Sequence, residues 1–352
     1  MRGGGEKMDE IRIGIIGSGF MARTHAEAFA AYTRGARLVA VYGGSRSGEL
    51  ARDYSIQAEQ SITGLLERTD VDAVVIATPQ SVHAEQVMAA ARYGKHVLLE
   101  KPMAVSLEEC RAMNIACQNA GVTLMVGFTQ RYRRGNVEAK RIIDAGQIGR
   151  IKMIRETMIG TDGRNVYPAW QRNKENRGTL LGYGVHSIDR IRWFTGNEVS
   201  SVTAHAVSPE GIDAEFSSML LLQLTNGQSA SLLCDMECPA PGFPNSAFHA
   251  WIIGENGIID LDAYGELRVG INGKWEVVFR QPPIDWQKEG KFSPVRMQSY
   301  RDQDQEFINS ILEHRQPQIT GVDGEKAVEV ALAAYESSRR KRSLELPLAL
   351  HG

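Results

Sequence analysis

A glycine-rich segment near the start of the chain has the residue types and spacing of a phosphate-binding turn. Apolar residues from Ile11 to Ile16 are followed by Gly17-Ser18-Gly19-Phe20-Met21-Ala22, which is the pattern G-x-G-x-x-A. Gly17 permits a tight bend, Gly19 lets backbone amides approach a pyrophosphate, and Ala22 allows the helix to pack closely on the strand. The alternative is a strand-to-helix turn without a ligand. The residues expected at a dinucleotide are Gly17, Ser18, Gly19, Phe20 and Met21.

The end of the second predicted strand indicates which dinucleotide is expected. About 20 residues past the glycine turn, an Asp or Glu would bind the ribose 2′-hydroxyl of NAD. The strand ends instead in Val41-Tyr42-Gly43-Gly44-Ser45-Arg46, which contains no carboxylate. The Ser45 hydroxyl and the Arg46 guanidinium are groups that bind a 2′-phosphate. The sequence therefore favours NADP over NAD, and the alternative is that Arg46 is a solvated surface side chain.

Two more strand ends carry polar residues. The predicted strand 73–76 runs into Ala77-Thr78-Pro79 and His83, and the strand 96–99 runs into Glu100-Lys101-Pro102. In open parallel sheets, ligands bind outside the carboxyl ends of the strands. An ammonium beside a reacting alcohol stabilises the developing alkoxide, so Lys101 is a candidate catalytic residue; the alternative is a structural ion pair with Glu100. The residues expected at the cofactor are Thr78, Pro79, His83, Glu100 and Lys101.

The elements that position these residues alternate between strand and helix. Further strands are predicted at Leu38–Tyr42, Ala73–Ile76, His96–Leu99 and Thr123–Val126, with helices at Ser47–Tyr54, Val82–Tyr93 and Leu107–Ala120. This alternation predicts an α/β domain with a parallel, doubly wound Rossmann sheet over residues 11–126. Residues 1–10 contain Gly3-Gly4-Gly5 and charges, and we expect a disordered leader, neither a signal peptide nor a membrane span.

From residue 127 to 352 the pattern changes to tightly connected strands. Strands are predicted at Ile151–Thr157, Phe216–Leu224, Ser229–Asp235, Ala250–Ile253 and Trp275–Phe279, followed by helices at Gln303–Glu313 and Gly324–Ser338. Asn226-Gly227 is a strong hairpin signal. We therefore expect a second α/β domain for substrate binding, with a mostly antiparallel sheet that leaves one face open. Such a face commonly pairs with a second subunit, which predicts a homo-oligomer, a dimer or tetramer.

Composition and charge exclude several classes of partner. The chain has 352 residues, 43% of them hydrophobic, and a formal net charge of −2. Such a charge provides no long-range field for nucleic acid or an anionic membrane, so neither is expected as a partner. The four cysteines, Cys110, Cys117, Cys234 and Cys238, have no C-x-x-C spacing and no His at ligand spacing. The sequence therefore predicts no metal site and fits a reducing, cytoplasmic location.

Several motifs taken together are recognisable. They are Gly17 to Ala22, Ala77-Thr78-Pro79 with His83, Gly94 to Pro102, and Gly184-Val185-His186-Ser187-Ile188-Asp189. This set resembles the Gfo/Idh/MocA family of glucose-fructose oxidoreductase, inositol dehydrogenase and rhizopine catabolism, and the resemblance spans nearly the whole chain. It implies a nicotinamide cofactor and oxidation or reduction at a carbon of a sugar, polyol or related cyclic diol. It also implies that Lys101 binds the reacting oxygen and that His186 is the acid/base.

One position departs from this family pattern. Members that oxidise polyols usually carry Asp four residues before the histidine, where this chain has Gly182. On a helix, residues 182 and 186 share one face, so His186 lacks a carboxylate neighbour. Its proton-transfer role survives, because an imidazole titrates near pH 7 without one. We expect Gly182 and Gly184 to leave volume for a bulkier substrate, and Asp189 is a candidate to orient the imidazole.

Aromatic and cationic residues early in the second domain suggest how a substrate would be held. Aromatic faces pack on sugar C–H surfaces, and guanidiniums bind hydroxyls or carboxylates. As a set they favour a polar, ring-shaped, carbohydrate-like substrate, although each one alone is more often structural. The candidate substrate residues are Lys101, Arg131, Tyr132, Trp170, Arg172, Tyr183 and His186.

The sequence leaves more than one activity open. The first hypothesis is an NAD(P)-dependent dehydrogenase or reductase that moves a hydride between nicotinamide and a CH–OH carbon of a sugar, polyol or related cyclic compound. Alternatives within the family are a dihydrodiol dehydrogenase and a redox-assisted glycoside-cleaving enzyme that keeps its cofactor bound. A catalytically silent, nucleotide-sensing regulatory protein is the alternative outside the enzymes, and Gly182 is the feature that supports it.

Overall fold

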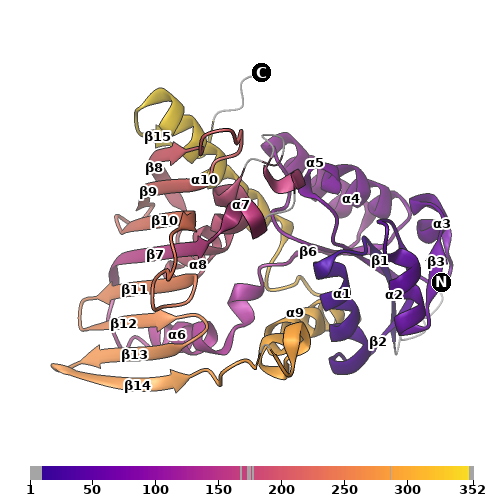
Figure 1. Cartoon of the computed structure of the whole chain (residues 1–352), viewed down its shortest axis with the longest axis horizontal. Helices are drawn as coiled ribbons and strands as arrows, with labels where there is room; N and C mark the ends of the chain where they lie inside the picture. The colour runs from indigo at the N-terminus through magenta and orange to yellow at the C-terminus, as the bar shows by residue number, and fades with distance from the viewer. Residues whose placement is uncertain (1–9, 167–168, 173–175, 177, 286, 349–352) are drawn as a thin grey trace, which may run out of the picture. The chain divides into compact units, whose positions relative to one another are not determined.

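The chain divides into two structural units (Figure 1). The computed structural model describes residues 10–166, 169–172, 176, 178–285 and 287–348, without the side chains of Arg164, Val166 and Trp170. The predicted disordered leader therefore lies outside the described residues, apart from Glu10. Unit 1 consists of Met1–Ala104, Glu108–Gly127 and Ile284–Val322, and unit 2 of Val105–Leu107, Phe128–Pro283 and Asp323–Gly352.

Unit 1 is built on a parallel sheet of six strands in the order β3-β2-β1-β4-β5-β6. This confirms the predicted Rossmann architecture. The strands are β1 (Ile11–Ile16), β2 (Ala36–Tyr42), β3 (Gln57–Glu59), β4 (Ala73–Ile76), β5 (His96–Leu99) and β6 (Leu124–Val126). Strands β1, β4 and the later part of β5 are almost entirely buried, since helices lie on both faces of a doubly wound sheet. Their continuous apolar runs are the reason these strands were readable from sequence.

The connecting helices of unit 1 place the candidate residues at the carboxyl ends of the strands. They are α1 (Phe20–Glu27), α2 (Ser47–Tyr54), α3 (Ile62–Glu67), α4 (His83–Arg92) and α5 (Leu107–Ala120), with a π-helix η1 (Ala28–Tyr32) and a 3-10 turn η2 (Gln80–Val82). The sequence did not predict β3 or α3, which are too short to give a clear periodic pattern.

A later segment returns to unit 1. Residues Ile284–Val322, which include the 3-10 turn η7 (Gly290–Phe292) and helix α9 (Pro294–Leu312), belong to this unit. The predicted division at residue 126 is therefore wrong for this segment. Its buried residues explain why: Met297 and Tyr300 pack with Ala28, and Asp304 contacts His25. Such long-range contacts leave no local pattern in the sequence.

Unit 2 is built on a mixed, mostly antiparallel sheet of nine strands in the order β14-β13-β12-β11-β7-β10-β9-β8-β15. Among the described strands of this sheet, only β7 and β10 pair in parallel. The bounds are β7 (Ile151–Thr161), β8 (Val199–Val207), β9 (Ser217–Leu224), β10 (Ser229–Cys238), β11 (Phe248–Gly254), β12 (Gly257–Asp262), β13 (Glu266–Ile271), β14 (Lys274–Arg280) and β15 (Leu344–Glu345). The predicted open-faced sheet is confirmed.

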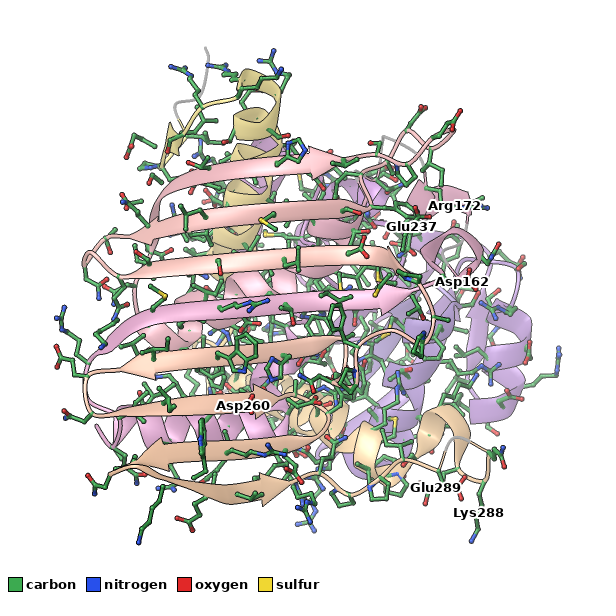
Figure 2. All side chains as sticks on the ribbon, turned by 60° about the vertical axis from the view of Figure 1, so that its left-hand side comes forward. Asp162, Arg172, Glu237, Asp260, Lys288 and Glu289 are labelled. Carbon is green, nitrogen blue, oxygen red and sulfur yellow. The ribbon has the colours of Figure 1, made fainter. Side chains whose placement is uncertain are left out.

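Helices cover one face of this sheet and leave the other free. The helices of unit 2 are α6 (Arg134–Asp144), α7 (Gly163–Val166), α8 (Val185–Thr195) and α10 (Gly321–Arg340), with 3-10 turns η3 (Thr129–Tyr132) and η4 (Ala169–Arg172) and a π-helix η6 (Leu180–Gly184). Side chains of β7 alternate from Met153 to Met158: Ile154, Glu156 and Met158 are buried, whereas Met153 and Arg155 are exposed. Figure 2 shows the free face, with Asp260 projecting from it.

The described chain contains no helix that is long and apolar enough to cross a membrane.

Candidate functional site

The glycine turn in unit 1 has the geometry that a pyrophosphate requires. Gly17 adopts φ +115°, and a Cβ there would lie 2.7 Å from the carbonyl oxygen of Ala77, so only glycine fits. Gly19 is the N-cap of α1, and a Cβ built on it meets no atom within 4 Å. The helix N-terminus therefore opens onto free space at the residue where a phosphate would approach. The turn fits a dinucleotide.

A second loop packs against this turn. The Ser18 hydroxyl accepts the backbone N–H of Arg46 at 3.2 Å, and a Cβ on Gly44 would lie 2.3 Å from Ser18 Oγ. Gly43 and Gly44 both have positive φ, which explains the glycine pair at the end of β2. Arg46 is exposed at the N-cap of α2. The loop that was predicted to contact the ribose thus lies directly beside the phosphate turn.

His83, the first residue of α4, is buried. Its ring is 1% exposed, with Nδ1 3.0 Å from the carbonyl oxygen of Pro102 and Nε2 2.9 Å from that of Thr78. Burial lowers the pKa of His83, although the carbonyl groups oppose that effect. The ring nitrogens face backbone carbonyl groups, and contact of His83 with the cofactor stays a prediction. Its role is to connect the segments that follow β4 and β5, which keeps Thr78 and Pro79 next to the Glu-Lys-Pro element.

Glu100 is likewise directed into the protein. Its Oε1 lies 2.9 Å from Nε2 of His25 on α1, and its Oε2 accepts the backbone N–H of Lys101 at 3.2 Å. Nδ1 of His25 lies 3.0 Å from each carboxylate oxygen of Asp304 on α9. Burial raises the pKa of Glu100, but the bond to His25 outweighs it and the net shift is downward. Glu100 therefore supports the backbone of Lys101, and its contact with a cofactor stays a prediction.

Lys101 follows directly after the carboxyl end of β5. Burial lowers the pKa of its ammonium, and the charge of Glu100 opposes this shift. The ammonium form stabilises a developing alkoxide, and a lowered pKa lets it exchange a proton more readily near neutral pH. Unit 1 thus presents the cofactor turn and a reactive amine at the carboxyl ends of strands in the same sheet.

His186 lies in the first turn of α8 in unit 2. Its side chain is 6% exposed, and its ring meets the rings of Phe128 and Phe248 edge-on, at centroid distances of 5.9 Å and 5.8 Å. T-shaped contacts of this kind fix the plane of an imidazole without using its nitrogens. The geometry suits a histidine that exchanges a proton from a defined orientation.

The segment before His186 is a π-helix, which the sequence did not predict. π-Helical turns are rare in proteins, and those that occur often lie at functional sites. A Cβ on Gly182 would meet no atom within 4 Å, in keeping with the expected free volume. A Cβ on Gly184 would lie 2.8 Å from Cys234 Sγ and 2.8 Å from Leu180, so the expectation of free volume is wrong there. Tyr183 packs beside Phe216, and burial raises the pKa of its hydroxyl.

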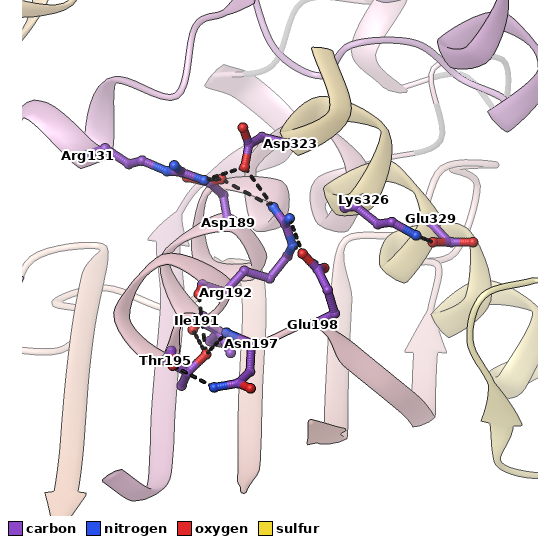
Figure 3. Close-up of polar contacts among 10 residues, drawn as sticks. All are labelled: Arg131, Asp189, Ile191, Arg192, Thr195, Asn197, Glu198, Asp323, Lys326 and Glu329. Carbon is purple, nitrogen blue, oxygen red and sulfur yellow. Dashed lines mark hydrogen bonds and ion pairs between the residues drawn. The ribbon is translucent and has the colours of Figure 1, made fainter. Parts of the chain in front are cut away.

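Asp189 does not orient the imidazole by the contacts that the structure gives it. Its carboxylate accepts two hydrogen bonds from the Arg131 guanidinium, at 2.8 Å and 2.5 Å, and Arg131 also contacts Asp323 at 3.0 Å (Figure 3). Burial lowers the pKa of Arg131, but the Asp189 charge reverses that shift. Arg192 joins the same network through Asp323 and Glu198. These contacts give Arg131 a structural position and weaken its assignment to the substrate.

The other predicted substrate residues are placed as follows. Tyr132 is buried in η3, and Arg172 is half-buried at the end of η4. Figure 2 shows Arg172 near the end of the sheet where β7 and β10 finish. The Trp170 side chain lies outside the described residues. Substrate contact by these residues stays a prediction.

Several charged side chains of unit 2 are buried, and their burial was not predicted from the sequence. Glu156 on β7 and Arg190 on α8 are both 0% exposed and approach to 3.4 Å. Burial raises the pKa of Glu156 to about 7, although Arg190 opposes this. Burial also raises the pKa of Glu215 to about 7; its Oε2 accepts the Leu180 N–H and the Tyr335 hydroxyl. An inward position in the alternation of β7 was the available signal for Glu156.

Among the described residues, no group of three or more His, Cys, Asp or Glu side chains could hold a metal ion. None of the four cysteines, all of which lie among the described residues, is in a disulfide, and three of them are buried.

A Rossmann unit with an open phosphate turn and a half-buried lysine at a strand end defines a nicotinamide-dependent class of protein. The chain belongs to the Gfo/Idh/MocA oxidoreductase family. The model for the family's NAD-binding Rossmann fold matches residues 11–128, and the model for its C-terminal alpha/beta domain matches residues 140–346.

Known relatives match over nearly the full length. An inositol 2-dehydrogenase 2 of Saccharopolyspora erythraea is 29% identical, over 93% of both chains. A 2,7-anhydro-N-acetylneuraminate hydratase of Escherichia coli is 27% identical, over 95% of both chains. The solved structure of apo scyllo-inositol dehydrogenase from Lactobacillus casei is similar with a TM-score of 0.79 and 25% identity, over 97% of this chain and 99% of that one.

Proposed function

We propose that this protein is a dehydrogenase or reductase that moves a hydride between a nicotinamide coenzyme and a CH–OH carbon of a sugar, polyol or related cyclic compound. The observation that carries the proposal is the position of Lys101. Its ammonium follows β5 in the sheet whose β1 ends in the dinucleotide turn, and burial lowers its pKa. The family assignment and the relative named for inositol support the same class of substrate.

The chain's own residues divide the chemistry of an alcohol oxidation. A bound nicotinamide supplies the hydride acceptor. As the carbon loses its hydride, the O–H bond breaks and a carbonyl forms, so negative charge develops on oxygen and a proton must be accepted. The Lys101 ammonium stabilises that charge, and the His186 imidazole accepts the proton. The enclosure of His186 by Phe128 and Phe248 keeps the imidazole in one orientation during the transfer.

For the coenzyme we propose NAD(H), with a loop that also admits NADP. The family model is described as NAD-binding, and the NADP preference expected from the sequence has no support among the relatives. The end of β2 nevertheless carries no carboxylate to repel a 2′-phosphate, and Arg46 is exposed beside the phosphate turn. Binding of both coenzymes, with NAD(H) physiological, fits these observations.

We propose a homo-oligomer, a dimer or tetramer, that forms through the open face of the unit 2 sheet. A large exposed apolar area on a sheet face indicates an interaction surface. Measurement of the mass in solution by light scattering tests this, and a monomer at micromolar concentration would contradict it. The exposed apolar residues on strands of this sheet include Met153, Met219, Leu221, Trp251, Trp275 and Val277.

A second candidate activity is a reaction that uses oxidation only transiently and returns the hydride. The relative named as a hydratase and the Gly182 position without an acid favour it. In this case the product forms without net change in the coenzyme. A cyclic anhydro-sugar or glycoside would be the substrate class.

The experiment combines the protein with NAD⁺ or NADP⁺ and a panel of inositols, aldoses, cyclic dihydrodiols and anhydro-sugars. Absorbance of the reduced coenzyme and chromatography of the sugars distinguish net oxidation from a transient redox cycle. Lys101→Ala should lower turnover about 100- to 1,000-fold, because a donor to the developing oxyanion is lost, while coenzyme affinity stays within about twofold. A loss of coenzyme binding with normal residual turnover would overturn the role of Lys101.

A further inference from the structure

A row of buried charged side chains in unit 1 joins the cofactor helix to the segment that carries Lys101. It runs from Asp304 on α9 through His25 on α1 to Glu100, at contact distances of 3.0 Å and 2.9 Å. Glu100 then accepts the Lys101 N–H at 3.2 Å. The side chains of His25 and Asp304 are at most 1% exposed, and that of Glu100 is 7% exposed. Helix α1 therefore has the phosphate turn at its start and, in its last turn, a contact to the catalytic segment.

The geometry determines the charge state of His25. Each ring nitrogen faces a carboxylate, whereas a neutral imidazole can donate from only one nitrogen. A neutral ring would place a lone pair against a buried negative charge. Burial alone lowers the pKa of His25, but Asp304 and Glu100 outweigh it and raise it to about 10. His25 is thus an imidazolium at neutral pH, clamped between two carboxylates.

This cation controls what Glu100 does to its neighbour. The Glu100 charge raises the pKa of Lys101, and a cation on its Oε1 offsets that effect. Other charged groups face the same row from separate elements: His83 on α4 faces Glu100, and Arg296 on α9 packs on Tyr300, whose ring meets His25 edge-on. Neither replaces the direct His25 contact.

We infer that His25 and Asp304 are positioning residues for Lys101, an inference that rests on the proposed function. They fix the Glu100 carboxylate against the backbone and neutralise it, so that the Lys101 amine keeps its orientation and remains reactive. Because His25 belongs to α1, the amine is positioned by the same helix whose N-terminus receives the pyrophosphate. Asp304 comes from a segment 279 residues away in sequence, which explains the return of α9 to unit 1.

The test compares His25→Gln with Thr24→Val in the full chain. Thr24 is the buried neighbour of His25; its hydroxyl donates to Phe20 and accepts from Arg296, away from Glu100. In His25→Gln we expect the pKa of Lys101 to rise by about one unit, since Glu100 is no longer offset. The high-pH limb of the kcat profile should move by the same amount. Because the Lys101 ammonium also loses its fixed orientation, kcat at neutral pH should fall about tenfold, while the Kd for NADH should change by less than about threefold. In Thr24→Val, the pKa of Lys101 and the high-pH limb of the kcat profile should be unchanged.

NMR of isotope-labelled lysine, with Lys101→Arg to assign the signal, measures the Lys101 titration without any turnover. An unchanged Lys101 midpoint in folded His25→Gln overturns the inference. If that variant does not fold, ring ¹⁵N shifts in the wild-type protein decide: a neutral His25 at pH 8 overturns it, and an imidazolium supports it. Absence of turnover with every sugar and polyol would instead contradict the proposed function, while both NMR results would still stand.

Discussion

The two units hold their candidate residues by different means. In unit 1, Lys101 is supported by charged groups that meet at hydrogen-bonding distance, His25 with Glu100 and with Asp304. In unit 2, the His186 ring meets the edges of Phe128 and Phe248, and Gly184 in the preceding turn packs closely on Cys234. The surroundings of the first residue are charged, whereas those of the second include aromatic edges and close packing.

The buried carboxyl groups show the consequence of this difference. Burial raises the pKa of Glu100, Glu156 and Glu215, but only Glu100 has a net downward shift, because a cation lies on its oxygen at 2.9 Å. Glu156 has its cation at 3.4 Å, and Glu215 accepts only neutral donors. A close cation does not decide the direction alone, because burial leaves the pKa of Asp304 raised although His25 lies 3.0 Å from both of its oxygens. The direction depends on the balance between burial and the partner charge at each site.

The largest effect on stability is expected when the buried pair of Glu156 and Arg190 is broken. Arg190→Met leaves the buried Glu156 without its cation, which typically costs about 3–5 kcal/mol. The double variant Glu156→Leu with Arg190→Met removes both charges and should recover most of that loss, since well-packed apolar residues often replace a buried pair without cost. Urea unfolding of both variants measures this.

The corresponding double variant in unit 1 should behave differently. Asp304→Asn with His25→Gln also removes both charges, but we expect no recovery of kcat, because Glu100 has lost the cation that offsets its charge. Recovery of kcat there, or no recovery of stability in unit 2, would break the distinction between the charged and the closely packed surroundings.

Two carboxyl groups with raised pKa values predict that the stability of unit 2 depends on pH. The folded pKa values of Glu156 and Glu215 are about 7, whereas an unfolded Glu titrates near about 4.3. Their folded forms bind protons more tightly, so this contribution to stability is fully present below the unfolded pKa and is lost as pH rises through about 7. Urea midpoints between about pH 5 and 8 should fall more in the wild type than in Glu215→Gln. Equal slopes would contradict the assignment. Glu100, with its lowered pKa, titrates below this window.

Much of unit 1 could be predicted from sequence because its determinants are local. The predicted bounds of β4, β5, α2 and α5 coincide with the structure, and each is a continuous apolar or helical pattern. At Gly17 the backbone geometry forces the residue type, whereas at Gly19 the Cβ position is open space that leaves room for a phosphate. The buried contacts of His83 and Glu100 could not be predicted, because the direction of these side chains depends on partners distant in sequence.

The site in unit 2 was less accessible to sequence reasoning. The π-helix before His186 has no periodic signature at its length, and the packing of Gly184 on Cys234 joins residues on separate elements. His25 was a plausible helix residue, but nothing near it in sequence indicated Asp304 as its partner. Spacing identifies which residue types are present, and only the fold shows which of them meet.

The two glycines of the π-helix sharpen the steric side of the comparison. Gly184→Ala places a methyl group 2.8 Å from Cys234 Sγ, and such overpacking costs about 1–3 kcal/mol. Gly182→Ala meets free space and should be neutral or stabilise by up to about 1 kcal/mol, because alanine favours helix. Thermal unfolding of both variants measures this. Equal destabilisation would mean that the turn tolerates no side chain at either position.

The smallest effect is expected at Arg46, a charge in unit 1 that is exposed. A guanidinium in contact with a 2′-phosphate contributes about 1.5–3 kcal/mol in a partly shielded site, and solvent reduces this, so Arg46→Ala should weaken NADP⁺ about tenfold and NAD⁺ by less than about twofold. Arg52→Ala, an exposed arginine on the same helix, is the control and should change neither affinity. Titration calorimetry with both coenzymes measures the ratio. Equal losses in Arg46→Ala would show that the loop after β2 acts through its backbone, as the N–H of Arg46 already does toward Ser18, and that unit 1 distinguishes coenzymes by shape and not by charge.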